Sequence, residues 1–231
     1  MDAHLVAIAT ITWARTAREE SALRNSVARL ASLGLPVAVA DAGVSPGFLQ
    51  FLHGVHGLDV SVPGERGLTA QVTTAVDMAA RVQTPFILYT EPDKEVFFDQ
   101  IGDFIARADG SPDVGVVLAA RTEESFTTFP PTQRYTETVV NHLCGQSIGL
   151  PGDYAYGPFI MNRSLLPVVR ALQPAVGWGW RPLLFVAAHR QGLRVMHIPG
   201  DRPCPLDQRA EDDEERSHRL RQLSENVLGL V

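Results

Sequence analysis

The sequence predicts an α/β fold, a single domain with a mostly parallel open sheet and helices on both of its faces. Short apolar runs recur along the chain, and each is followed by a stretch with helical spacing. Most of these runs lack polar alternation, which is typical of strands buried on both faces. Strands separated by helices favour parallel pairing, because a parallel neighbour needs a crossover connection.

The predicted strands are short and mostly rich in Val, Ile, Leu and Ala. The first is apolar throughout, whereas the third, Leu58-Asp59-Val60-Ser61-Val62, alternates between apolar and polar residues. In chain order the predicted strands are residues 5–9, 36–40, 58–62, 85–90, 114–120, 156–161 and 193–198. The polar residues 10–20 are expected to leave the first strand as a loop.

Helical signals fill the segments between the strands. Val27 and Leu30 recur at helical spacing, and Gly34 follows them as a stop signal. Ser45 and Pro46 are residue types favoured at a helix start. The predicted helices are residues 23–33, 45–52, 68–82, 97–108, 134–143, 183–191 and 211–228.

Length and composition indicate one globular domain. The 231 residues are 45% hydrophobic and 20% charged, which excludes a disordered chain. We predict one domain over residues 1–205, with residues 121–155 as an irregular insertion, and a C-terminal helix within 206–231. Acids precede bases along that helix, which suits its dipole. A second copy of the chain is expected to pack on it.

Several classes of partner and location are disfavoured. A net charge of −6 without basic runs argues against nucleic acid and anionic lipid. The chain contains no run of about eighteen apolar residues, so we expect no membrane span. The first residues include an acid at position 2 and lack the basic start of a signal peptide. Cys144 and Cys204 lack Cys-x-x-Cys spacing, so we expect reduced thiols and a cytoplasmic protein.

The sequence lacks the signature motifs of three common enzyme classes. The chain has no Gly-x-x-x-x-Gly-Lys-Ser/Thr loop and no Gly-x-Gly-x-x-Gly after the first strand. It also has no Gly-x-Ser-x-Gly elbow. A P-loop enzyme, a dinucleotide-dependent dehydrogenase and an α/β-hydrolase are therefore disfavoured.

Ligands of open α/β sheets bind beyond the carboxyl ends of the strands. The sharpest feature at such an end is Glu91-Pro92-Asp93, where a rigid turn separates two carboxylates. Such a pair suits a hard divalent cation that bridges two phosphates. The alternative is an ordinary helix start, with Pro92 in the first turn and acids favourable to the dipole.

The order of features resembles the nucleotide-diphospho-sugar transferases of the glycosyltransferase A-type, Rossmann-like fold. The first block is Asp41 after the second strand, Gly67 before an alanine-rich helix, and Glu91-Pro92-Asp93 in place of the family's Asp-x-Asp. The second block is residues 153–163, followed by Gly177-Trp178-Gly179-Trp180, a helix and a Gly-x-Arg-Val strand. The resemblance spans about residues 5–200, and its order and spacing carry it.

The resemblance implies a metal-dependent glycosyltransferase. Such an enzyme transfers a sugar from a nucleotide-diphosphate sugar to a hydroxyl of a small acceptor and uses Mg²⁺ or Mn²⁺. The residues implied to bind substrate or nucleotide are Thr10, Thr12, Arg15, Asp41, Gly67, Arg121, Trp178 and Trp180. The implied metal ligands are Glu91, Asp93 and His197.

The chain also departs from the family. Inverting members carry an acidic pair after the Gly-Trp-Gly turn, where this chain has Arg181-Pro182, and Asp153 is the nearest substitute for the general base. A catalytically inactive module that binds sugar nucleotides therefore stays open as an alternative. A sugar nucleotidyltransferase is weaker, because Thr10 to Trp13 replace its glycine-rich loop. Asp41 can also be a turn acid, His197 an ordinary hydrogen-bonded side chain, and each tryptophan a core residue.

Overall fold

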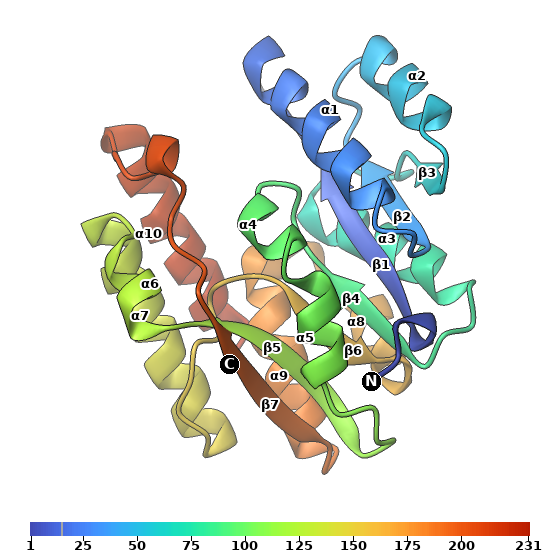
Figure 1. Ribbon diagram of the computed structural model, residues 1–231. Helices are drawn as coiled ribbons and strands as arrows, with labels where there is room; N and C mark the ends of the chain where they lie inside the picture. Colours follow the sequence, from blue (N-terminus) through green and yellow to red (C-terminus); the bar gives the residue numbers. More distant parts are fainter. Residues whose placement is uncertain (15) are drawn as a thin grey trace. The chain divides into compact units, whose positions relative to one another are not determined.

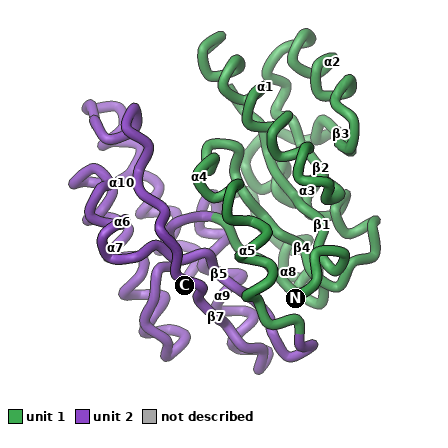
Figure 2. The backbone as a smooth tube through the Cα atoms, in the orientation of Figure 1, with its two compact units in different colours: residues 1–110, 158–174 green, residues 111–157, 175–231 purple. Residues whose placement is uncertain are grey.

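The computed structural model describes residues 1–14 and 16–231, and its contacts divide the chain into two compact units (Figure 2). Unit 1 comprises residues 1–110 and 158–174. Unit 2 comprises residues 111–157 and 175–231. Each unit therefore combines segments that are distant in the sequence.

Unit 1 is built on strands in the order β3-β2-β1-β4-β6. These are β3 (Leu58–Ser61), β2 (Val37–Asp41), β1 (Val6–Thr12), β4 (Phe86–Tyr89) and β6 (Phe159–Asn162). The first four strands pair in parallel, whereas β6 runs antiparallel to β4. β1 and β2 are buried along their whole length, as their unbroken apolar runs predict.

Helices cover both faces of this sheet. In Figure 1, α4 and α5 lie in front of the strands and α3 lies behind them. The buried face of α3 presents Val72, Ala75, Val76 and Ala79, which recur at helical spacing. The helices of unit 1 are α1 (Ala17–Ala31), α2 (Pro46–Gly54), α3 (Leu68–Ala80), α4 (Glu95–Phe98), α5 (Ile101–Arg107) and α8 (Leu166–Arg170), with two 3₁₀ turns, η1 (Ala3–Leu5) and η2 (Arg163–Leu165).

Unit 2 pairs β5 (Val114–Arg121) in parallel with β7 (Arg194–Gly200). Its helices are α6 (Glu123–Thr127), α7 (Pro131–Ile148), α9 (Trp180–Arg190) and α10 (Asp213–Leu228), with the 3₁₀ segments η3 (Pro174–Gly179) and η4 (Leu206–Gln208). α9 packs on both strands, and α10 packs on α7 and α9.

The α/β class with mostly parallel strands is confirmed, and local signals place most elements within a few residues. Ser45 caps α2 as expected, because its side chain accepts the N–H of Phe48. The predicted helix over 97–108 is wrong in one respect, since the chain forms two helices that break at Asp99 and Gln100. The predicted loop from residue 10 begins later, because β1 continues to Thr12.

The prediction that residues 121–155 form an irregular insertion is wrong. α6 and α7 fill most of this stretch. The buried face of α7 includes Gln133, Thr136 and Gly145, so its apolar periodicity is weak even though the helix is long. The predicted boundary at residue 205 stays a prediction, and α10 packs within unit 2.

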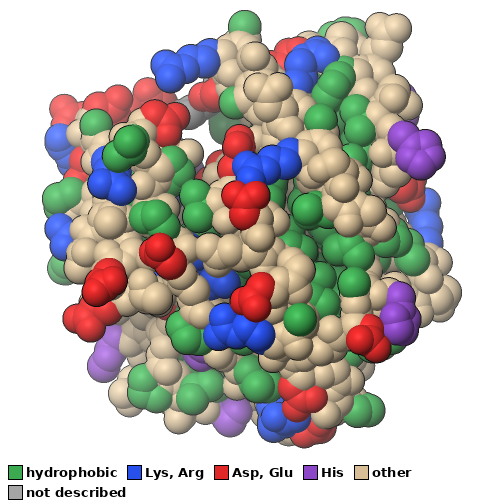
Figure 3. Space-filling model, viewed as in Figure 1, with side chains coloured by type: hydrophobic (Ala, Val, Ile, Leu, Met, Phe, Trp, Pro, Cys, Tyr) green, Lys and Arg blue, Asp and Glu red, His purple; other side chains and the backbone are tan. Residues whose placement is uncertain are grey.

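The surface carries charges of both signs. Figure 3 shows Asp and Glu side chains interspersed with Lys and Arg on the face drawn. Among the helices that the structure describes, none has the length and apolar character needed to cross a membrane.

Candidate functional site

A closed hydrogen-bond network holds the carboxyl ends of β1 and β2 in unit 1. Thr12 Oγ1 donates to Asp41 Oδ1 at 2.8 Å. The backbone N–H groups of Gly43 and Val44 donate to Asp41 Oδ2 at 3.0 and 3.2 Å. Asp41 is fully buried, so its carboxylate shapes the turn after β2.

α3 adds a second set of contacts to the same edge. Gln71 Nε2 donates to the backbone oxygens of Thr12 and Ala40 at 3.0 and 3.4 Å. Gly67 precedes α3 with a φ of 114°, a conformation that side-chain-bearing residues rarely adopt. The start of α3 is therefore fixed against the ends of both strands.

Three of the predicted nucleotide residues of unit 1 are fully buried, whereas a fourth, Gly67, is exposed. Thr10 and Thr12 both lie within β1 and are fully buried. Asp41 ends β2 and is also fully buried, so it is the turn acid of the alternative interpretation. Arg15 lies outside the described residues. Contact of any of these residues with a nucleotide stays a prediction.

The acidic turn after β4 places its two carboxylates in different environments. Glu91 is buried, whereas the Asp93 side chain is 51% exposed and its Oδ2 meets Lys94 Nζ at 2.7 Å. α4 begins only at Glu95, so Pro92 lies before the helix and not in its first turn. The turn is therefore a separate acidic corner at the carboxyl end of β4.

No group of three or more His, Cys, Asp or Glu side chains that could hold a metal occurs among the residues that the structure describes. Glu91 and Asp93 supply two carboxylates. Mg²⁺ commonly takes one or two carboxylates and completes its shell with water and substrate phosphates. The acidic corner therefore fits a cation that a phosphorylated substrate also coordinates. His197, the third predicted ligand, belongs to unit 2.

A buried charge cluster occupies the carboxyl end of β5 in unit 2. Arg121 Nε donates to Asp153 Oδ2 at 2.8 Å and Nη2 donates to Oδ1 at 2.9 Å. Arg121 Nη2 also lies 2.7 Å from Glu137 Oε2. Asn141 Nδ2 also donates to Asp153 Oδ1, at 3.3 Å.

Aromatic rings enclose the same guanidinium. Its central carbon lies 4.7, 4.5 and 5.3 Å from the ring centres of Phe126, Phe129 and Tyr156. Cation–π attraction is stronger in such a desolvated place. The Arg121 side chain is only 1% exposed, so its guanidinium is engaged by this cluster. Contact of Arg121 with a substrate phosphate stays a prediction.

The cluster also decides the protonation state of Asp153. Burial alone raises the Asp153 pKa, but the Arg121 guanidinium and the N–H groups that donate to the carboxylate lower it below its usual range. A general base works best with a pKa near the working pH. Asp153 is a weak proton acceptor here, and its predicted role as general base finds no support in this geometry.

His197 is packed tightly within β7. The Tyr154 ring meets its imidazole edge-on at 4.6 Å between centres. A Cβ on Gly152 would lie 2.3 Å from the ring, so only glycine fits there. Burial lowers the His197 pKa, and Asp153 only partly opposes this. The neutral imidazole is the form that binds metals, and its ligand role stays a prediction.

The two predicted aromatic platforms have different exposures. Trp180 is fully buried and belongs to the core. Trp178 is half-buried, and the Arg181 guanidinium lies 5.0 Å from its ring centre. No local pattern predicts a role for Glu225, whose carboxylate accepts the backbone N–H of Trp178 across a separation of 47 residues.

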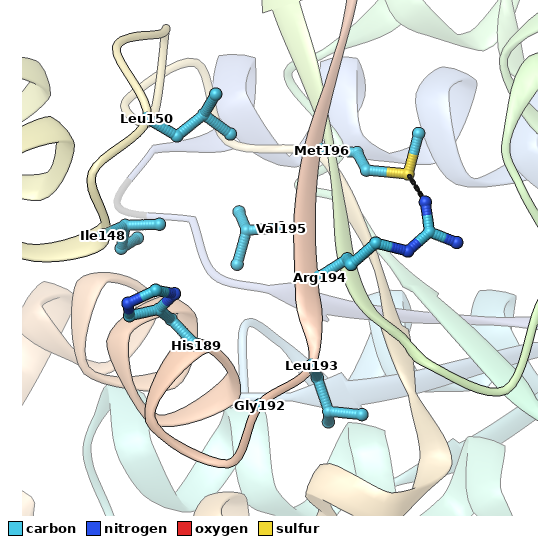
Figure 4. A pocket seen from close by; sticks show the side chains of 8 residues that line it. All are labelled: Ile148, Leu150, His189, Gly192, Leu193, Arg194, Val195 and Met196. Atoms are coloured by element: carbon cyan, nitrogen blue, oxygen red, sulfur yellow. Dashed lines mark hydrogen bonds between the residues drawn. The ribbon is translucent and has the colours of Figure 1, made fainter.

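A pocket of about 340 Å³ lies at the other end of unit 2 (Figure 4). It includes Arg194, the first residue of β7, so it lies at the amino end of that strand. Figure 4 shows Ile148, Leu150, His189 and Val195 around the same space. Ligands of α/β sheets bind at the carboxyl ends instead, and the predicted site residues do not line this pocket.

Comparison with known proteins finds similarity in solved structures alone. No protein-family model matches the chain, and no curated protein matches it. Mannosyl-3-phosphoglycerate synthase from Rubrobacter xylanophilus superposes with a TM-score of 0.66 at 14% identity, covering 97% of this chain and 72% of that one. Glucosyl-3-phosphoglycerate synthase from Mycobacterium tuberculosis gives a TM-score of 0.65 at 14% identity, covering 97% and 80%.

A third structure is the M. tuberculosis enzyme in complex with Mn²⁺, uridine diphosphate and glucosyl-3-phosphoglycerate. It superposes with a TM-score of 0.59 at 14% identity, covering 97% of this chain and 79% of that one. At such identity the likeness shows the fold alone, which this chain shares with these two synthases.

Proposed function

We propose that this chain, which shares the fold of glucosyl- and mannosyl-3-phosphoglycerate synthases, is a nucleotide-sugar-dependent glycosyltransferase. The supporting observation is that the likeness extends over 97% of the chain, so nearly the whole fold is shared with these synthases. In the reaction, the bond between the sugar carbon and the diphosphate oxygen breaks. The nucleotide diphosphate leaves with the electron pair of that bond. A new bond to an acceptor oxygen forms, and the proton of the acceptor hydroxyl passes to solvent.

We propose Glu91 and Asp93 as the residues that hold Mg²⁺ or Mn²⁺. Bound there, the cation would neutralise the charge of the departing nucleotide diphosphate. Asp93 is half exposed, and its partner Lys94 carries a cation that the diphosphate also attracts. The two carboxylates and the ammonium thus match a site shared with phosphate oxygens.

The buried networks are proposed to keep the site in shape. Asp41 holds the backbone of Gly43 and Val44, which face the end of β2 where the nucleotide of the donor is proposed to bind. Preorganised groups of this kind speed group transfer by positioning the reactants.

The acceptor is proposed to be a small hydroxylated molecule. The M. tuberculosis relative was solved with phosphoglyceric acid, which makes that compound a first candidate to test here. The cytoplasm stays the proposed location.

Calorimetric titration with UDP-, GDP- and ADP-sugars, with and without Mn²⁺, tests this function. We expect one donor to bind about tenfold more tightly with Mn²⁺, and Asp93→Ala to abolish that gain. Asp207→Ala is the control, because Asp207 is an exposed acid on η4 in the other unit. Absence of nucleotide binding by the wild-type protein would contradict the proposal.

A non-catalytic module is the second candidate. The pairing of Asp153 with Arg121, which lowers the pKa of Asp153, favours it. Mass spectrometry of the donor–acceptor mixture tests for a transferred sugar. Donor binding without any such product would support that alternative. Release of pyrophosphate from a nucleoside triphosphate and a sugar phosphate would indicate a nucleotidyltransferase instead.

A further inference from the structure

The acidic corner lies at the point where the strand order of unit 1 reverses. β1 pairs with β2 on one side and with β4 on the other, and β3 lies beyond β2. The carboxyl ends of β1 and β4 are joined, because the N–H of Thr90 donates to the backbone oxygen of Ala9 at 3.2 Å. Open α/β sheets bind ligands at such a reversal. The corner and the residue that follows it, Lys94, therefore lie where a ligand is expected.

Lys94 closes the turn that carries the two acids. Its N–H donates to the backbone oxygen of Glu91 at 3.2 Å, which makes residues 91–94 a four-residue turn with Pro92 at its second position. Its own backbone oxygen accepts the N–H of Phe97 at 2.9 Å, and Phe97 is fully buried in α4. The backbone of Lys94 is therefore fixed on both sides, and its side chain begins next to the Asp93 carboxylate.

The Lys94 ammonium lies against one of the two carboxylates. Its Nζ is 2.7 Å from Asp93 Oδ2, and the Lys94 side chain is only 22% exposed. Lys94 is also the only lysine among the 20 Lys and Arg residues of the chain. Arginine holds a carboxylate with a rigid fork, whereas a lysine ammonium is a compact charge on a flexible stem. A lysine here can release Asp93 and turn to another anion while the backbone stays in place.

The next acid along the chain has different partners. Glu95 accepts the hydroxyl of Ser26 at 2.6 Å and lies 3.5 Å from Arg29 Nη1. These contacts join α4 to α1, whereas the pair of Lys94 and Asp93 lies within a single turn of the chain. Loss of the Lys94 charge therefore leaves these contacts between α1 and α4 in place.

We propose that Lys94 is a built-in counter-ion of the acidic corner, which competes with Mg²⁺ or Mn²⁺ for Asp93 and, once displaced, pairs with the diphosphate of the donor. The inference rests on the proposed function, to which the metal and the diphosphate belong. A divalent cation and an ammonium repel one another and need the same carboxylate. Removal of the ammonium therefore tightens binding of the metal alone, whereas it weakens binding of a nucleotide diphosphate to the metal-loaded protein.

Three variants separate the charge of Lys94 from its shape. Lys94→Met keeps a similar length and removes the charge, whereas Lys94→Arg keeps the charge. Arg107→Met is the control for net charge, because Arg107 is an exposed cation on α5 that pairs with Asp103 at 3.3 Å. Thermal melting of each variant checks that the fold is retained.

The first measurement uses Mn²⁺ without nucleotide, with free Mn²⁺ followed by electron paramagnetic resonance. We expect Lys94→Met to bind Mn²⁺ about fivefold more tightly than the parent, and Lys94→Arg and Arg107→Met to stay within about twofold of it. Equal affinities in Lys94→Met and Arg107→Met would overturn the competition, and so would the absence of Mn²⁺ binding from all four proteins. No nucleotide takes part, so donor binding tests the proposed function separately.

The second measurement uses the single lysine as a probe. Protein labelled with lysine carrying ¹³C at Cε gives one side-chain signal, which reports the surroundings of Nζ. We expect saturating Mg²⁺ to move this signal toward its position in Asp93→Asn, in which the ammonium has lost its charged partner. The signal of Asp93→Asn should not respond to Mg²⁺. A parent signal that Mg²⁺ leaves unmoved would overturn the displacement.

The third measurement adds UDP at saturating Mn²⁺; GDP or ADP replaces UDP if the donor panel selects another base. We expect Lys94→Met to bind the nucleotide diphosphate about fivefold more weakly, with Lys94→Arg and Arg107→Met within about twofold of the parent. Unchanged or tighter binding by Lys94→Met would overturn the pairing with the diphosphate. If the parent binds no nucleotide diphosphate, the proposed function and this pairing fail together, while the Mn²⁺ measurement still decides the competition for Asp93.

Discussion

Arg121 and Asp153 form a side-on ion pair at the carboxyl end of β5. Two parallel hydrogen bonds of 2.8 and 2.9 Å join the guanidinium to the carboxylate, and Asp153 also accepts the backbone N–H of Arg121 at 3.0 Å. The side chains are 1% and 12% exposed. The pair joins the segment after α7 to the end of a buried strand, so we expect its loss to lower stability.

Asp153→Ala is expected to lower the free energy of unfolding by about 3 kcal/mol, because a buried guanidinium loses its main partner. Urea denaturation followed by circular dichroism measures the change. The control is Asp113→Ala, which removes the exposed pair between Arg194 and Asp113, where we expect less than about 1 kcal/mol. Equal losses in the two variants would show that Arg121 does not depend on Asp153.

The same pair predicts a loss of stability in acid. Because the folded-state pKa of Asp153 is lowered, its contribution is present above the ordinary aspartate pKa of about 3.9 and is lost as the pH falls through the lowered value. Urea midpoints at a series of pH values between about 6 and 2 measure this. Asp153→Asn should show a flatter slope below about pH 4. A parallel slope would assign the acid loss to other carboxylates.

Gly179→Ala is expected to destabilise the protein by about 2 kcal/mol or more, because overpacking forces a backbone shift. The new Cβ would lie 2.1 Å from the Glu225 oxygen and 2.9 Å from the Gly229 nitrogen. Gly102→Ala is the control, since nothing lies near its Cβ position on α5, and we expect it to stabilise by about 0.5 kcal/mol. Thermal melting compares the two, and a neutral Gly179→Ala would contradict the close approach of α10.

Both thiols are expected to be inert in the folded protein. Cys144 and Cys204 are buried and form no disulfide, and burial raises the pKa of Cys144 to about 12 despite the opposing Arg181 charge. A thiol with so little thiolate reacts slowly. Dithionitrobenzoate should label neither residue in native protein and both in denaturant. Rapid labelling of either thiol in native protein would contradict this.

Association through α10 stays a prediction. Leu220 and Leu228 of this helix are each about half exposed, so they provide apolar surface for a second copy of the chain. Equilibrium sedimentation should show a dimer that Leu220→Glu weakens. A monomer at every concentration would remove the prediction.

The sequence by itself determined the elements whose signals are local. Unbroken apolar runs predicted β1 and β2, and the Ser45-Pro46 pair predicted the start of α2. The acidic corner at residues 91–93 was likewise predictable as the end of a strand, because it directly follows an apolar run. These features depend on residues that are neighbours in the chain.

Only the tertiary structure decided which polar side chains are buried in internal contacts and which stay exposed to solvent. Arg121 and Asp153 are 32 residues apart, and Trp178 and Glu225 are 47 apart, so no local pattern pairs them. The sequence predicted α7 only over residues 134–143, because polar residues line part of its buried face and weaken the apolar periodicity. Burial and pairing are properties of the packed chain, and they depend on contacts that hydrophobic periodicity does not encode.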